Sequence, residues 1–192
     1  MKSILTGAVA ASALLCTSVA FAAPLKLTPA TKSPKSGGLS VKYAWAGDPP
    51  ARIQSLNEAK QMLGGAKAGP PLRGLDYADT NKGDPVMTHE QHYNVAADIR
   101  GYIKFDAPGI YELETWSNDG IEARIGGQVV GKQPTRSGGC DPNQRVEVEV
   151  PKAGWYPLQI QYFQKYGTSC LMMKWGKKGE KLKWVPNNAF GR

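Results

Sequence analysis

The sequence predicts an all-β protein: an antiparallel β-sandwich with one short helix in the N-terminal half of the chain. From residue 99 onward, short segments alternate apolar and polar side chains, which is the pattern of half-buried strands. Turn-forming residues separate these segments about every 8–12 residues. A helical pattern with start and stop signals occurs within residues 53–65. Many short alternating strands joined by turns favour a sandwich or a barrel.

The first 22 of the 192 residues have the composition of an export signal. Lys2 precedes an apolar run over residues 4–20, and Ala20-Phe21-Ala22 fits an A-x-A cleavage site. The run is too short and too rich in Ala and Ser for a persuasive membrane anchor, so we expect no stable membrane span after cleavage. A retained anchor is the alternative. We therefore expect a secreted or periplasmic protein.

Residues 23–38 are rich in Pro, Ser, Thr, Lys and Gly and lack periodicity, which predicts a flexible leader. The folded domain is then expected over residues 39–192, with a first strand over residues 39–45. Ser55 and Glu58 form a capping box that would start the short helix, and two glycines would end it. The remainder of residues 46–98 is predicted to be a long loop with short strands.

The second half of the chain is predicted to contain eight strands. The alternation is clearest around Val146, Val148 and Val150, which face inward while charged neighbours face outward. The predicted strands are residues 99–105, 110–116, 121–125, 128–131, 145–150, 155–163, 170–175 and 182–185.

Antiparallel pairing places alternate connections at opposite ends of the domain. The polar corner 117–120 and the loops 132–144 and 164–169 are therefore expected at one end. Cys140 lies in the first loop and Cys170 directly after the second. They form an even pair in an oxidising compartment once Cys16 leaves with the signal, so we predict a disulfide. It would stiffen an end whose loops are suited to binding.

Composition and motifs argue against several function classes. The net charge is +8, but the lysines are scattered and no recognition motif accompanies them, so no nucleic-acid partner is expected. His89 and His92 are one residue too close for the H-E-x-x-H zinc motif. Residues 79–90 lack glycine at the sixth position of a helix-loop-helix calcium site. No nucleophile elbow or phosphate loop is found, and we expect no enzyme.

Three segments together resemble a known family. "IRGYIKFDAPGIYELETWSNDGIEARIGGQVVG" resembles the first half of the protective-antigen domain, PA14, with its Gly-Tyr strand, Pro-Gly turn, S-D-D-G corner and following hairpin. "KAGWYPLQIQYFQKYGTSCLMMKWGKKGEKLKWVPNNAF" resembles the second half, and "GLSVKYAW" resembles the opening strand. The resemblance covers about residues 38–190, and it is weak over residues 47–98.

The resemblance implies a secreted β-sandwich that mostly serves as a non-catalytic binding module. In lectin-like members, two adjacent aspartates at the corner, joined by a cis peptide, hold a calcium ion that coordinates sugar hydroxyls. The matching positions here are Asn118 and Asp119, which become the candidate calcium ligands. Asn118 supplies one negative charge fewer, and calcium affinity falls with ligand charge.

We therefore expect an adhesin-like module that binds a glycan or cell-envelope component through the loops beside this corner. The alternative is a structural or protein-interaction module of the envelope without a small-molecule or metal ligand, and a hydrolase is the third possibility. The candidate ligand-binding residues are Asn118, Asp119, Trp116, Arg136, Asp141 and Tyr166.

Overall fold

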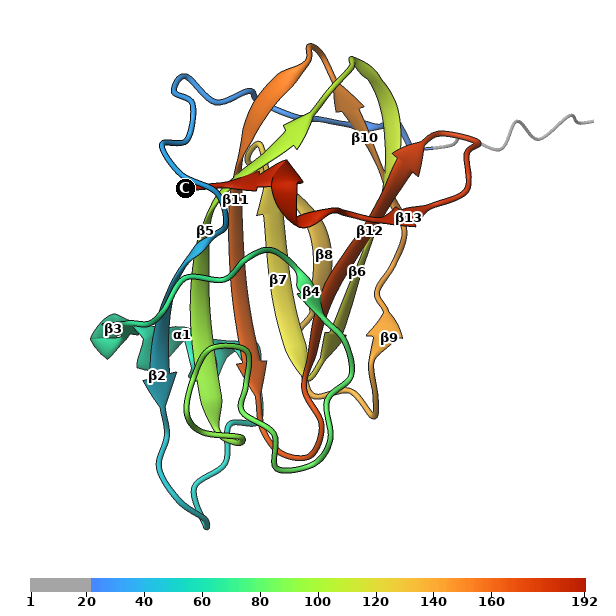
Figure 1. Ribbon diagram of the computed structural model, residues 1–192. Coiled ribbons are helices and arrows are strands. Elements are labelled where there is room, and N and C mark those ends of the chain that lie inside the picture. Colours follow the sequence, from blue (N-terminus) through green and yellow to red (C-terminus); the bar gives the residue numbers. More distant parts are fainter. Residues whose placement is uncertain (1–21) are drawn as a thin grey trace, which may run out of the picture.

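The computed structural model describes residues 22–192, so the predicted signal peptide, apart from Ala22, lies outside the described residues. Two β-sheets face each other (Figure 1), and pairing within them is almost entirely antiparallel. This confirms the all-β sandwich with one short α-helix. Within residues 22–192, none of the helices has the length and apolar character that crossing a membrane requires.

The first sheet contains the polar corner at the end of its central strand. Its order is β1 (Leu25–Lys26), β10 (Val146–Val150), β6 (Gly109–Asn118), β12 (Cys170–Lys177) and β13 (Lys183–Trp184). Two further short strands join it: β4 (Asp76–Tyr77) pairs with β12, and β9 (Asp141–Pro142) pairs with β6.

The second sheet is built around β5 (Val95–Phe105) and β11 (Gly154–Gln164), which pair along their full length of 11 residues. Its order is β3 (Lys67–Ala68), β2 (Ser40–Trp45), β5, β11, β7 (Gly120–Ile125) and β8 (Gln128–Gln133), and β14 (Phe190–Gly191) pairs with β5. All eight strands predicted from residue 99 onward are present, although β5 begins earlier than expected.

The core lies between the sheets and follows the predicted alternation. Leu113 and Val148 from the first sheet and Ile99, Ala123 and Ile160 from the second are all fully buried. Their side chains sit at alternate positions of their strands, so one face of each strand contributes to this core. This packing fixes the register of the strands and thereby the places where the connecting loops emerge.

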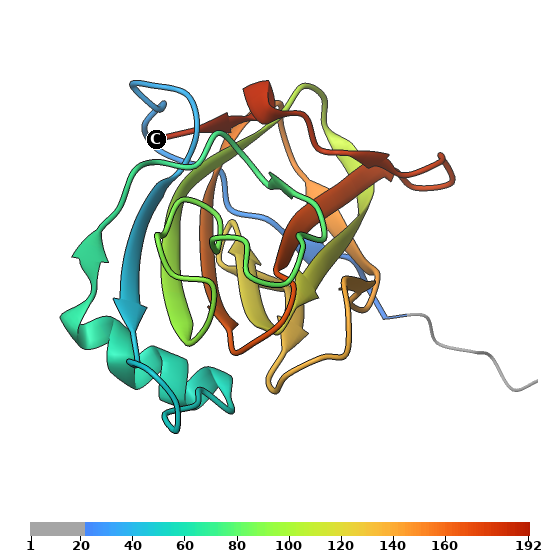
Figure 2. The ribbon, with the colours of Figure 1, turned by 60° about the horizontal axis from the view of Figure 1, so that its bottom comes forward.

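The helix α1 (Leu56–Met62), followed by the 3-10 turn η1 (Leu63–Gly65), covers part of the outer face of the second sheet (Figure 2). Ser55 caps its N-terminus by accepting from the Glu58 N–H at 3.3 Å, as the capping box predicts. Leu56 and Ala59 pack against Ala96 and Phe163 on the sheet. The segment before the helix is thereby held beside the end of β11.

Residues 25–30 differ from the flexible leader that their composition predicts. The strand β1 pairs in parallel with β10, and the Leu27 N–H donates to the Glu149 carbonyl at 2.9 Å. The Leu27 side chain is 1% exposed and belongs to the core. Leu25 and Leu27 are two residues apart, so both side chains can point to the same face of a strand. Pairing of β1 with β10 turns that face toward the core.

The two ends of the sandwich differ in their connections. The corner 118–120 and the loops 132–144 and 164–169 meet at one end, which we call the loop end and which is the lower end in Figure 1. The opposite end, which we call the turn end, carries the tight turns around Gly126 and Gly154. The strand directions agree with the parity argument made from the sequence.

Candidate functional site

The cysteine pair joins two of the loop-end connections. Cys140 and Cys170 form a disulfide with their Cα atoms 5.5 Å apart, across a separation of 30 residues. This confirms the predicted bridge. Cys170 pairs with Asn118 in the register of β6 and β12, so the bridge lies directly beside the polar corner.

A pocket of about 390 Å³ opens at the loop end. It draws residues from four segments of the chain: the stretch before α1, the corner between β6 and β7, and the loops 132–144 and 164–169. Four of the six predicted ligand-binding residues line it. Its lining residues are Arg52, Asn118, Asp119, Arg136, Ser137, Gly138, Lys165, Tyr166, Gly167 and Thr168.

Asn118 is held by a buried polar network under the pocket. Its Nδ2 donates to the Thr168 carbonyl at 2.9 Å and lies 3.1 Å from the Thr168 hydroxyl, and its peptide bond to Asp119 is cis. Its carbonyl accepts from the Tyr162 hydroxyl, which also lies 2.9 Å from Gln164 Oε1. Gln164 Nε2 in turn donates to the Thr168 carbonyl at 2.7 Å. These bonds fix the corner and the loop 164–169 relative to each other.

Gly120 completes the corner because the position has no room for a side chain. A Cβ there would collide with the ring of Phe163 on the neighbouring strand. The close approach of β7 to β11 at this point therefore requires glycine.

Asp119 is a shielded carboxylate, only 3% exposed as a residue. Its Oδ2 accepts from the Lys165 N–H at 2.7 Å. Burial raises the pKa of the Asp119 carboxyl above its ordinary value, although the N–H groups of Lys165 and Ser137 and the nearby positive charges oppose that increase. The same burial, together with the charge of Asp119, raises the pKa of the Tyr162 hydroxyl.

Tyr166 is the aromatic side chain of the pocket. It is 54% exposed, and the Lys82 ammonium lies 4.9 Å from its ring centre. An exposed aromatic ring beside hydrogen-bonding groups is a suitable surface for stacking against an amphipathic ligand.

Two predicted ligand-binding residues do not line this pocket. Trp116 lies on the outer side of β6, where its ring packs edge-on against Trp184 at 5.4 Å and Lys174 lies over both rings. Asp141 is exposed on β9, where it pairs with Ser117 through the backbone. Trp116 shares its face of β6 with Glu112 and Glu114, so the alternation of the strand already indicated that it points away from the core.

Sequence reasoning missed Arg52 and Lys165. Arg52 belongs to an irregular segment that shows no periodicity, and only its tertiary contacts bring it to the loop end. Asn94, which is fully buried, holds this segment: its Nδ2 donates to the Ala51 carbonyl at 2.7 Å. Gln164 was also missed, although a glutamine at an inward position of a strand is a signal of a buried polar network.

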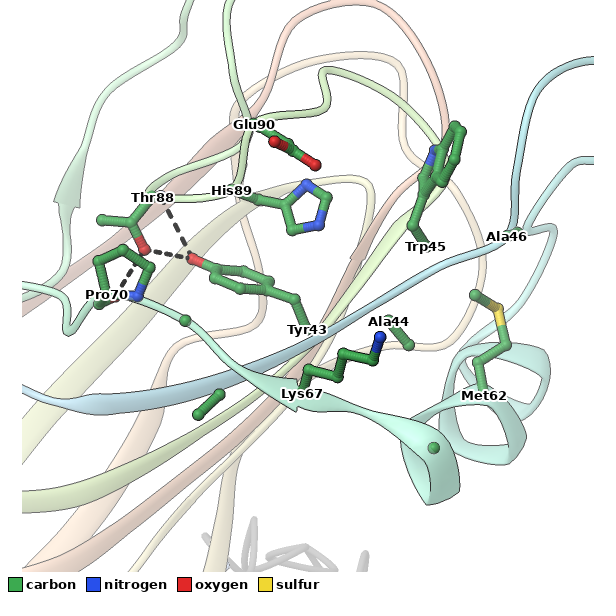
Figure 3. Close-up of a pocket in the computed structure, with 13 residues that line it drawn as sticks. Tyr43, Ala44, Trp45, Ala46, Met62, Lys67, Pro70, Thr88, His89 and Glu90 are labelled. Carbon is green, nitrogen blue, oxygen red and sulfur yellow. Dashed lines mark hydrogen bonds between the residues drawn. The ribbon is translucent and has the colours of Figure 1, made fainter.

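A larger hollow of about 940 Å³ lies over β2 and β3 and shares no lining residue with the loop-end pocket (Figure 3). Tyr43, Trp45 and Met62 supply its apolar surface, and His89, beside Tyr43, and Glu90 supply polar groups. His89 Nδ1 accepts from the Gln91 N–H at 2.9 Å and burial lowers the pKa of its imidazole.

The second histidine of the near-motif makes different contacts. The His92 ring packs against Tyr93 at 4.5 Å, whereas the His89 ring packs against Tyr43 at 5.0 Å. The two imidazoles therefore have separate neighbours.

The loop-end residues do not fit a calcium ion well. Calcium takes six to eight oxygen ligands and favours negatively charged ones. Asp119 is the one carboxylate in the pocket lining, which also contains the positively charged Arg52, Arg136 and Lys165. Within the described residues, no group of three or more His, Cys, Asp or Glu side chains is arranged to hold a metal.

A rigid sandwich with a pocket built from the connections at one end is the architecture of a binding module. A family model for the PA14 domain matches residues 77–189. The chain belongs to the PA14 domain family.

Solved structures share this fold at low sequence identity. The "PA14 sugar-binding domain from RTX adhesin" is 15% identical with a TM-score of 0.66, covering 82% of this chain and 99% of that one. The PA14 domain of the antifreeze protein MpAFP is 13% identical with a TM-score of 0.65, covering 84% and 94%. The Epithelial Adhesin 9 A domain from Candida glabrata, solved with Galb1-3GlcNAc, is 14% identical with a TM-score of 0.63, covering 88% and 96%. No curated protein sequence matches the chain.

Proposed function

We propose that this chain is an exported, non-catalytic carbohydrate-binding module whose loop-end pocket holds part of a glycan of a cell surface or envelope. The observation that carries the proposal is the pocket itself, which presents the Asp119 carboxylate, the Asn118 amide and the exposed Tyr166 ring together. Saccharides present hydroxyl groups around an apolar ring face, so acceptors beside an aromatic surface match them. The sugar-binding PA14 domains with the same fold support this reading.

The pocket is suited to binding rather than hydrolysis. Glycoside hydrolases use a pair of carboxyl groups, about 5–10 Å apart, across the bond they cleave. Among the lining residues, Asp119 alone carries a carboxylate. Export is supported by the disulfide, which persists in oxidising compartments.

A glycan array with the purified protein tests the proposal. We expect binding to a subset of glycans, and we expect Asp119→Asn to weaken it about tenfold or more because a charge-assisted hydrogen bond becomes a neutral one. Asn keeps the shape of the side chain and can still accept from the Lys165 N–H.

Glu90→Gln, which removes a charge in the larger hollow, is the matched control and should leave the array signal unchanged. An array without any bound glycan, or an unchanged signal with Asp119→Asn, would contradict the proposal. The first of these results would favour a structural or protein-interaction module.

A further inference from the structure

The loop-end pocket is positively charged. Arg52, Arg136 and Lys165 line it, whereas Asp119 is its one carboxylate and is shielded by burial. Both arginines are exposed, so their guanidinium groups are available to a ligand in the pocket.

Specific contacts bring these three cationic residues together. The segment that carries Arg52 is tied to the loop 132–144 by a bridge between Ser55 and Thr135, next to Arg136, and by a hydrogen bond of 2.9 Å from the Leu56 N–H to the Pro134 carbonyl. Lys165 Nζ donates to Gln54 Oε1 at 2.8 Å, which ties the loop 164–169 to the same segment. Contacts between folded segments therefore hold the three positively charged residues near one another.

The two arginines of the pocket differ from most arginines of the protein. Arg73, Arg100, Arg124 and Arg145 each form an ion pair with a carboxylate. Arg52, Arg136 and the C-terminal Arg192 form none with the residues that the structure describes. Arg52 uses one of its five N–H groups on the neighbouring Ala51 carbonyl, at 3.2 Å.

We infer that the pocket takes an acidic saccharide, with the carboxylate of a uronic or similar acidic sugar bound by Arg52 and Arg136. A guanidinium group matches a carboxylate through two parallel hydrogen bonds and stays charged at all physiological pH values. Asp119 and Asn118 then accept from hydroxyl groups of the same sugar, and Tyr166 covers its ring. This inference rests on the proposed function and names its ligand class. Charge attraction to the ligand takes the place of a bridging calcium ion.

Calorimetric titration with a matched pair of probes tests the inference. We compare tri-galacturonate with its fully methyl-esterified form, which has the same sugar rings but carries an uncharged methyl ester in place of each carboxylate. We expect the acid form to bind at least tenfold more tightly, without added calcium and in the presence of a chelator. Arg52→Gln and Arg136→Gln should each weaken the acid form about tenfold while leaving the ester unchanged.

Arg73→Gln is the charge-matched control, because it also removes one positive charge but lies outside the pocket. It should change the affinity for the acid form less than twofold. A third probe, a sulfated oligosaccharide without carboxylates, separates a carboxylate from a sulfate as the bound group. Tighter binding of the sulfated probe would overturn the assignment to a carboxylate.

Equal affinity for acid and ester would overturn the inference, as would a chelator that abolishes binding. Absence of binding by both forms would overturn it as well. The proposed function is judged separately, by the effect of Asp119→Asn on whichever glycans the array identifies.

Discussion

At the scale of single residues, the two corner positions have different tasks. The Asn118 side-chain nitrogen donates to Thr168 and its backbone carbonyl accepts from Tyr162, so both groups hold the corner in place, whereas its side-chain oxygen has no hydrogen-bond partner among the described residues. An aspartate at this position could not donate to the Thr168 carbonyl, so the amide suits this network. Asp119 instead offers a hydrogen-bond acceptor to the pocket. Burying its carboxylate costs stability.

The raised pKa of Asp119 has a consequence for stability. Because its pKa is higher in the folded than in the unfolded protein, its favourable contribution is fully present at low pH and is lost as pH rises through the folded-state pKa. We therefore expect the melting temperature of Asp119→Asn, relative to the wild type, to be higher at about pH 7 than at about pH 4. Thermal unfolding of both proteins across this pH range measures the difference in melting temperature. Groups that both proteins share, such as His89, titrate in both and so do not contribute to this difference. A difference that is constant with pH would contradict the expectation.

At the scale of elements, the loop end depends on cross-links between connections. The Gln164 amide braces the loop 164–169 internally, whereas the Asn118 amide and the disulfide fix this loop to its neighbours. The bridge between Ser55 and Thr135 adds the segment before α1. Loops of this length would otherwise sample many conformations and have to be ordered on binding. The cross-links therefore make the pocket largely preformed.

Removing the disulfide should lower stability substantially. For the double variant Cys140→Ala/Cys170→Ala we expect the free energy of unfolding to fall by roughly 3–4 kcal/mol, which is the chain-entropy value for a loop of this size. Urea denaturation measures the change, and wild-type protein treated with a reductant should show a similar loss. Two free thiols in denatured, unreduced wild-type protein would disprove the bridge itself.

The elements differ in how far the sequence could predict them. The strands of the second half were predictable because their apolar residues alternate, and strand parity alone brought Cys140 and Cys170 to the same end as the corner. Arg52 could not be found in this way, since it reaches the pocket through contacts of Asn94 and of the loop 132–144, which are distant in sequence. Trp116 is near the corner in sequence, but its outward position on β6 keeps it out of the pocket lining.

At the scale of the whole molecule, the segment 25–30 is an integral part of the sandwich. It lengthens the first sheet by one strand and crosses to the second sheet, where the Thr28 N–H donates to the Gly126 carbonyl at 3.0 Å. Leu27 fills space between the sheets at the turn end. These contacts could not be predicted from the composition of the segment, because most of its side chains are polar or small.

Leu27→Ala should therefore destabilise the whole domain. We expect a loss of about 2–5 kcal/mol, which is typical when a buried leucine is truncated. Lys26→Ala on the same strand is the control, and its exposed side chain predicts a change within about 0.5 kcal/mol. Equilibrium denaturation compares the two variants, and equal stabilities would show that β1 adds nothing to the core.

The segment before β2 and the C-terminus meet at the turn end. The Lys35 and Ser36 N–H groups donate to the Arg192 carbonyl, and Arg192 follows β14 on the half of β5 farthest from the corner. In Figure 1 the C-terminus accordingly lies at the opposite end of the sandwich from the corner. An anchor, fusion partner or biosensor surface attached at Arg192 leaves the loop end pointing outward. The protein can thus be immobilised through its C-terminus with every copy presenting the pocket to the solution.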